Sequence, residues 1–146
     1  MKKLLILFVL LLVAAGLYFV LRPTPLTTVK IGDQNVYAEM ADKKAEQELG
    51  LMNRESLEAD HGMLFVYSST NVPVFWMKNM LISLDMIFIG PDKTINHIIQ
   101  NIPPCTEEND ENCPTYHSPE PTQYILEVNA GYAQAHQIKV GDSVEF

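Results

Sequence analysis

The chain has 146 residues, a length that favours one folded domain, and ten lysines and arginines stand against eighteen acidic residues. This acidic balance argues against nucleic acid as a partner and against docking on anionic lipid, because both depend on clustered basic side chains. Hydrophobic residues make up 47% of the chain, which argues against a disordered protein.

The first predicted element is a membrane-spanning helix over residues 4–21. These eighteen residues contain no charge, no proline and one glycine, and this is the length that an α-helix needs to cross a bilayer. A cleaved signal peptide is the alternative, with a small-residue site at 14–16. Because the apolar run continues past that site, we expect the helix to remain as an uncleaved signal anchor.

Basic residues next to the helix predict its orientation. Lys2 and Lys3 precede it, so we expect the N-terminus in the cytoplasm and the remaining chain on the periplasmic or extracellular side. Without these two lysines, eight basic residues stand against eighteen acidic residues, so the exported part carries a formal charge of −10. The expected organisation is a membrane anchor over 1–22, a linker over 23–27 and a single extracytoplasmic domain over 28–146.

A β-hairpin and a short helix are predicted at the start of this domain. Apolar and polar residues alternate over 29–31 and again over 36–40, on either side of a polar turn, as is typical of paired strands. A helix over 43–49 follows, with Asp42 as its N-cap and Gly50 placed to end it.

The rest of the domain has the pattern of short strands separated by turns. The predicted elements are strands over 63–67, 74–77, 84–89 and 94–102, a long proline-rich loop over 103–121, a strand over 124–128, a helix over 130–137 and a closing strand over 140–146. About seven strands with two short helices indicate a small α+β domain. We expect its mostly antiparallel sheet to be strongly curled or barrel-like.

Two carboxylates occupy unusual places in these strands. Alternation puts Asp85 on the same face as Ile87, and Glu127 on the same face as Ile125. A carboxylate among apolar residues must be paired or lie at the rim of a cleft, because burying it alone is very costly.

Two interpretations of these carboxylates remain open. In the functional one, Trp76 and Lys78 share the face of a cleft in which Asp85 or Glu127 acts as a general acid or base. In the structural one, Lys78 forms a partly buried ion pair with one of the two carboxylates and fixes the strand register. Structural ion pairs are common at such positions, and we favour that interpretation.

Cys105 and Cys113 lie on the oxidising side of the membrane in this topology, so a disulfide between them is the default expectation. A catalytic cysteine would need a free thiol with a lowered pKa, and zinc would need a clear set of four ligands. The acidic run 107–112 lacks the spacing of a calcium-binding loop, so we interpret it as solvated.

Methionines raise the question of a metal carrier, since thioethers with His61 are the soft ligands of Cu(I). They lack a close Met-x-Met cluster, and several lie inside apolar strands where methionine commonly fills gaps. No phosphate-binding loop, serine elbow or zinc-protease motif is present. We therefore expect neither metal nor cofactor. The methionines are Met40, Met52, Met63, Met77, Met80 and Met86.

Several blocks, in order and at plausible spacing, resemble the family called domain of unknown function 192. They include Gly50–Arg54, His61–Phe65, Phe75–Asn79, Leu84-Asp85, Pro104-Cys105, Cys113–Tyr116 and Leu126–Gly131. The resemblance extends from about Val36 to the C-terminus. Met80, Ser83 and Gly90 depart from residues common in the family. The resemblance implies a fold and no established activity.

These observations favour a membrane-tethered extracytoplasmic domain that binds an unknown small-molecule or envelope ligand, rather than an enzyme. One alternative is a cell-envelope hydrolase with Asp85 or Glu127 as general acid or base, and another is an assembly partner of an envelope protein. Catalytic residues stay unassigned. The candidate cleft residues, some of them from the family-like blocks, are Arg54, His61, Trp76, Lys78, Asn79, Asp85 and Glu127.

Overall fold

The structure is a computed structural model that describes residues 25–107 and 110–146. The expected anchor over 1–22 and the first two residues of the expected linker lie outside the described residues. Among the described residues, no helix has the length and apolar character that crossing a membrane requires.

The described chain consists mainly of strands. The strands are β1 (Leu26–Ile31), β2 (Gln34–Ala41), β3 (His61–Asn71), β4 (Phe75–Trp76), β5 (Leu84–Ile89), β6 (Ile95–Ile102), β7 (Thr115–Tyr116), β8 (Thr122–Asn129) and β9 (Val144–Glu145). The helices are α2 (Lys44–Leu49) and α3 (Tyr132–Ala135), with a 3-10 turn, η1, at Asp110–Asn112. The predicted α+β class is confirmed.

Seven of these strands form one curled sheet in the order β6-β5-β8-β3-β2-β1-β9. All neighbours are antiparallel except β2 and β3, which are parallel. The two ends of the sheet meet, because Thr94 forms a bridge with Ser143 and the Val144 amide donates to the Lys93 carbonyl at 2.8 Å. The predicted mostly antiparallel and strongly curled sheet is therefore confirmed. β4 and β7 form a separate two-stranded pair.

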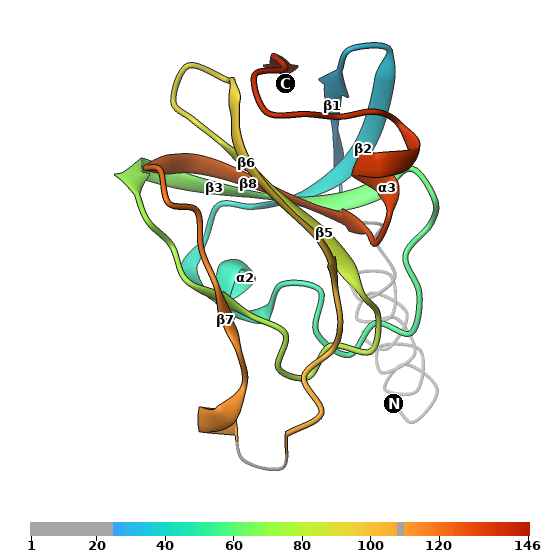
Figure 1. The fold of residues 1–146 in the computed structure, drawn as a ribbon, viewed down its shortest axis with the longest axis vertical. Coiled ribbons are helices and arrows are strands. Elements are labelled where there is room, and N and C mark those ends of the chain that lie inside the picture. Colours follow the sequence, from blue (N-terminus) through green and yellow to red (C-terminus); the bar gives the residue numbers. More distant parts are fainter. Residues whose placement is uncertain (1–24, 108–109) are drawn as a thin grey trace, which may run out of the picture.

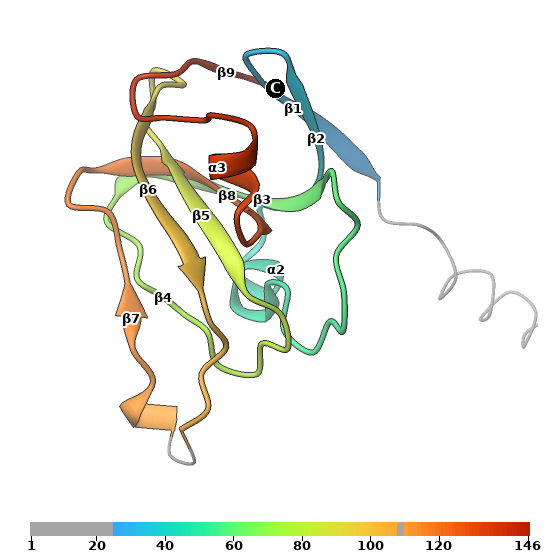
Figure 2. The ribbon, with the colours of Figure 1, turned by 45° about the vertical axis from the view of Figure 1, so that its right-hand side comes forward.

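Two apolar cores lie on the two faces of the central strands β3, β5 and β8. One fills the inside of the curl and includes Val36, Leu64 and Leu126, with α3 packed against it. The other lies on the outer face, around Phe65 and Phe88. Figure 2 shows α2 and the β4–β7 pair on this outer side. Every residue of β5 is buried, because the strand faces both cores.

Element boundaries differ from the sequence predictions in places where tertiary contacts decide them. β1 begins at Leu26, inside the expected linker, because Leu26 is paired with Glu39 of β2. Lys43, rather than Asp42, is the N-cap of α2. The backbone amide and the ammonium group of Lys43 both donate hydrogen bonds to the carboxylate of Glu46. Gly50 ends α2 as predicted, with a φ of 51° that favours glycine.

The C-terminal elements are shorter than the alternation of residues suggested. α3 has four residues in place of the predicted helix over 130–137, and β9 has two in place of the strand over 140–146. Between them the chain turns through Gln137 and Gly141, both with positive φ. The predicted long loop over 103–121 contains η1 and β7.

Candidate ligand-binding cleft

The parallel pairing of β2 with β3 requires a crossover connection, and α2 lies in this connection on the outer side of the sheet (Figure 2). Gln47 fastens the helix to the sheet, because its side-chain amide donates to the carbonyls of Val66 at 2.9 Å and Ala41 at 3.2 Å. Between the segment Lys44–Met52, the outer face of β3 and β8, and the segment Val74–Trp76, the chain leaves an open cleft of about 320 Å³.

Aromatic side chains form one wall of the cleft. Phe75 packs edge-on against Phe65 at a centroid distance of 5.1 Å, which fixes β4 on the sheet. The next residue, Trp76, also lines the cleft and is half exposed. Tyr67, from the same face of β3 as Phe65, lines it as well. The wall therefore presents ring surfaces to anything that enters.

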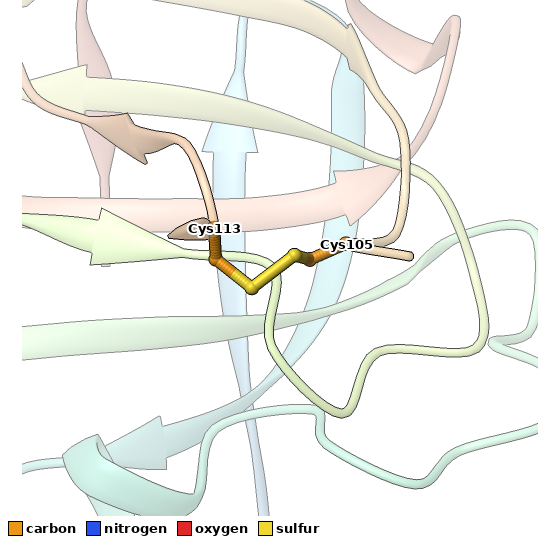
Figure 3. The surroundings of a disulfide bond; sticks show 2 residues. All are labelled: Cys105 and Cys113. Atoms are coloured by element: carbon orange, nitrogen blue, oxygen red, sulfur yellow. A yellow bond between two sulfur atoms is a disulfide. The ribbon is translucent and has the colours of Figure 1, made fainter. Parts of the chain in front are cut away.

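The expected Cys105–Cys113 disulfide is present and holds the strand that supports this wall (Figure 3). Cys113 lies two residues before β7, in which Thr115 is paired with Trp76. At the other end, the amide of Cys105 donates to the carbonyl of Met77 at 3.0 Å, next to Trp76. The disulfide thus connects two segments that both adjoin Trp76.

Glu127 lines the cleft from β8 and is 5% exposed. In the sheet it is paired with Met63 on one side and Met86 on the other. Among the described residues, no hydrogen bond or ion pair reaches its carboxyl group. Burial in these apolar surroundings raises the pKa of Glu127 from 4.5 to about 8. Burial, and then the nearby charge of Glu127, also raise the pKa of Tyr67.

Charged groups near the cleft entrance interact with one another. Lys44 and Glu48 form an i,i+4 ion pair at 3.6 Å on α2, and both are well exposed. Lys78 lies with its Nζ 5.6 Å from the centroid of the Trp76 ring, which is the neighbourhood predicted for these two residues. Lys78 does not itself line the cleft.

Asp85, in contrast, points into the core on the other face of the sheet and is fully buried. Its Oδ1 accepts hydrogen bonds from the amides of Asn101 at 2.8 Å and Gly131 at 3.0 Å, and its Oδ2 accepts one from Ala133 at 2.9 Å. The expectation that Asp85 needs a partner is met by backbone amides. In the described part of the chain no ion pair links Asp85 to Lys78 or Glu127 to Lys78, so the structural interpretation that we favoured for these residues was wrong.

Three further predicted cleft residues are not part of the cleft lining. Arg54 forms a two-pronged ion pair with Glu39 of β2, with one N–O distance of 2.8 Å. The His61 ring contacts the Tyr37 ring at a centroid distance of 5.8 Å, with the ring planes tilted by 44°. The Asn79 side chain lies at the edge of the cleft, where it donates to the Met52 sulfur at 3.9 Å.

The structure therefore places two of the seven candidates, Trp76 and Glu127, in the lining of one cleft. Sequence reasoning missed Tyr67, although its alternation with Phe65 along β3 was readable. It also missed the contribution of α2, for which the sequence held no signal. Among the described residues, no group of three or more His, Cys, Asp or Glu side chains is placed to hold a metal ion.

Comparison with known proteins adds a family and a fold. The family DUF192, described as "Uncharacterized ACR, COG1430", matches residues 27–146. A crystal structure of a protein of unknown function from Novosphingobium aromaticivorans is similar, with 34% identity, a TM-score of 0.75, and coverage of 83% of this chain and 85% of that one. A "putative transcription regulator" from Sinorhizobium meliloti is 33% identical, with a TM-score of 0.74 and coverage of 85% and 97%. None of the curated proteins matches the chain.

Proposed function

The chain belongs to the uncharacterised family DUF192, and from its geometry we propose that the cleft beside α2 binds a small organic ligand. Glu127 is the observation that carries this proposal. A carboxyl group buried among methionines and aromatic rings, without a partner in the described chain, is costly to the fold. Such a cost is typical of residues that are retained for binding or catalysis.

The shape and lining of the cleft support a ligand of modest size. Its volume of about 320 Å³ lies at the lower end of small-molecule sites. Its lining is mainly apolar and aromatic, and Glu127 is the charged side chain of the lining that is buried. A few well-placed polar groups in an apolar pocket are the usual arrangement for orienting a small ligand.

The second part of the proposal is that this domain acts outside the cytoplasm while tethered to the membrane. It rests on the eighteen uncharged residues of segment 4–21 and on Lys2 and Lys3 before them. The Cys105–Cys113 disulfide supports it, because disulfides persist mainly in oxidising compartments.

Binding has better support than hydrolysis of envelope material. Hydrolysis of a glycosidic bond commonly uses two carboxyl groups that flank the bond. Asp85 lies on the opposite face of the sheet from Glu127 and is occupied by three amides, so it offers no second group to the cleft. The other carboxylate of the cleft lining, Glu48, is exposed and ion-paired with Lys44, so a general-acid role would fall to Glu127.

A matched set of probes tests the binding function. Benzyl alcohol, benzoate and benzylammonium share one ring and differ in charge, and each is added to the full-length protein in a thermal-unfolding assay. At least one should raise the melting temperature, and by more as its concentration is increased. The Trp76→Ala variant should lose this stabilisation. Leu81→Ala, which truncates an exposed apolar side chain outside the cleft lining, should keep it. Equal responses of both variants, or no response to any probe, would contradict the proposal.

A further inference from the structure

The ligand class follows from the group that the cleft leaves without a partner. Resting on the proposed binding function, we propose that the cleft takes a small organic cation, whose ammonium group pairs with the carboxylate of Glu127 and contacts the rings of Tyr67 and Trp76. A protonated amine and a quaternary ammonium ion share this chemistry.

The first support is the unmatched carboxyl group itself. Glu127 is 5% exposed and flanked by Met63 and Met86, and no described residue supplies a cation or a hydrogen-bond donor to it. Buried charges in proteins are paired, because an isolated one is strongly destabilising. A cationic ligand supplies the partner that the ionised form of Glu127 lacks, whereas an anionic ligand would oppose its ionisation.

The aromatic wall supplies the second contact that an ammonium group favours. Cations are attracted to the faces of tryptophan and tyrosine rings within about 6 Å, and such rings recognise quaternary ammonium ligands in other proteins. Trp76 already attracts a cation of the chain itself, since Nζ of Lys78 lies 5.6 Å from its ring centroid. The part of the Trp76 ring that lines the cleft is available to contact a second cation, that of the ligand.

The electrostatic surroundings agree with a cation. Lys44 is the basic residue in the cleft lining, and its charge is offset by the ion pair with Glu48. The part of the chain that follows the N-terminal lysines carries a formal charge of −10. A field of this sign raises the local concentration of cations and lowers that of anions.

Binding of a cation should displace a proton from Glu127. Its pKa of about 8 leaves the free carboxyl largely protonated at neutral pH, and the cation stabilises the ionised form. The titratable groups that face the cleft are Lys44 and Glu48 from α2 and Tyr67 from β3, while β4 and β5 present aromatic and aliphatic side chains. The pKa of Tyr67 is raised, so Glu127 is the group that titrates near neutrality.

Choline and its neutral isostere 3,3-dimethylbutan-1-ol test the inference, because neither titrates in this range and they differ in charge alone. Each is titrated into full-length protein in phosphatidylglycerol nanodiscs, whose lipid carries no ammonium group. Choline should bind more tightly than the isostere by about tenfold or more, as expected for a desolvated charge pair. Its affinity should rise about tenfold per pH unit below about pH 8 and level off above it, with release of about one proton per choline.

Two variants separate the contribution of the Glu127 charge to choline binding from that of the Trp76 ring. Glu127→Gln should weaken choline binding by about tenfold or more and abolish its pH dependence, while binding of the isostere changes little. Trp76→Leu, at a half-exposed position, should keep its fold and weaken choline more than the isostere. Phosphatidylcholine nanodiscs distinguish a lipid headgroup from a free solute: a headgroup ligand would change Trp76 fluorescence before any choline is added.

Equal affinity for choline and the isostere would overturn the inference. A choline affinity that changes neither with pH nor on Glu127→Gln would also overturn it. The proposed binding function would still stand if benzyl alcohol or benzoate stabilised the protein through Trp76. Failure of all the benzyl probes as well would remove both proposals.

Discussion

Asp85 and Glu127 lie on adjacent antiparallel strands, yet their carboxyl groups point to opposite faces of the sheet. The register explains this, because Asp85 is paired with Val128 and Glu127 with Met86. The two positions are therefore offset by one residue, and side chains alternate between faces along a strand. One carboxylate fixes the fold through backbone amides, and the other faces the cleft.

Replacing Asp85 by Asn should destabilise the domain by about 2–4 kcal/mol, because a buried carboxylate accepts three amide hydrogen bonds there. An asparagine keeps one acceptor oxygen and turns an N–H group towards a backbone N–H. Urea unfolding of the wild type and the variant measures the difference.

Lys78→Met is the control for this substitution. If Asp85 depends on amides and not on Lys78, the double variant Asp85→Asn with Lys78→Met should lose stability by the sum of the losses in the two single variants. Recovery of stability in the double variant would instead reveal an ion pair between them.

Glu127→Gln should change how stability depends on pH. Folding raises the pKa of Glu127 from 4.5 to about 8, so the folded state holds a proton that the unfolded state has lost. Stability is then greatest below about pH 4.5 and falls as the pH rises to about 8, by an amount on the order of a few kcal/mol. The neutral glutamine avoids this loss, so the variant should match the wild type near pH 5 and be more stable than it near pH 9.

Melting temperatures across this pH range, measured without ligand, test the expectation. Glu120→Gln is a suitable control, since Glu120 is exposed and its removal should shift the curve by a similar small amount at every pH. Parallel curves for the wild type and Glu127→Gln would show that Glu127 is solvated.

Much of the fold was predictable because its sheet follows local rules. The hairpin of β1 and β2, the strands β5 and β6, and the faces of Asp85 and Glu127 all follow from alternation of side chains and from turn residues. The curl of the sheet was also anticipated from the number of short strands.

The cleft was less predictable, because contacts between distant segments form it. The prediction placed Trp76, Lys78, Asp85 and Glu127 on one face, but alternation within a strand does not give the register between strands. β5 and β8 are paired across about forty residues of sequence, and the offset of one residue separates the two carboxylates. Arg54 likewise pairs with Glu39 of β2, and the ring of His61 contacts Tyr37 of β2.

If segment 4–21 is the proposed membrane anchor, the protein should stay in the membrane fraction after a high-salt wash, because hydrophobicity and not surface charge would drive its insertion. Cell fractionation with detection of the C-terminus measures this. A reporter fused after Phe146 should be active only outside the cytoplasm. Recovery of a soluble chain that begins near Gly16 would indicate a cleaved signal peptide.

Removing the disulfide should affect both stability and the cleft wall. Changing Cys105 and Cys113 to Ala frees a short loop, which should lower the free energy of unfolding by about 2–3 kcal/mol on the chain-entropy estimate. The loop leads into β7, and Thr115 of β7 is paired with Trp76. The aromatic wall of the cleft should therefore become mobile at a lower temperature than that at which the sheet unfolds.

Trp76 is the chain's single tryptophan, so its fluorescence reports on the wall directly. We expect emission at longer wavelength in the Ala variant at a temperature where circular dichroism shows an intact sheet, because a loosened β4 exposes the indole ring to water. Wild-type protein treated with a reductant should reproduce the shift, and the Ala variant treated in the same way should not respond. Unchanged emission in a folded but less stable variant would show that the packing of Phe75 on Phe65 holds β4 without help from the disulfide.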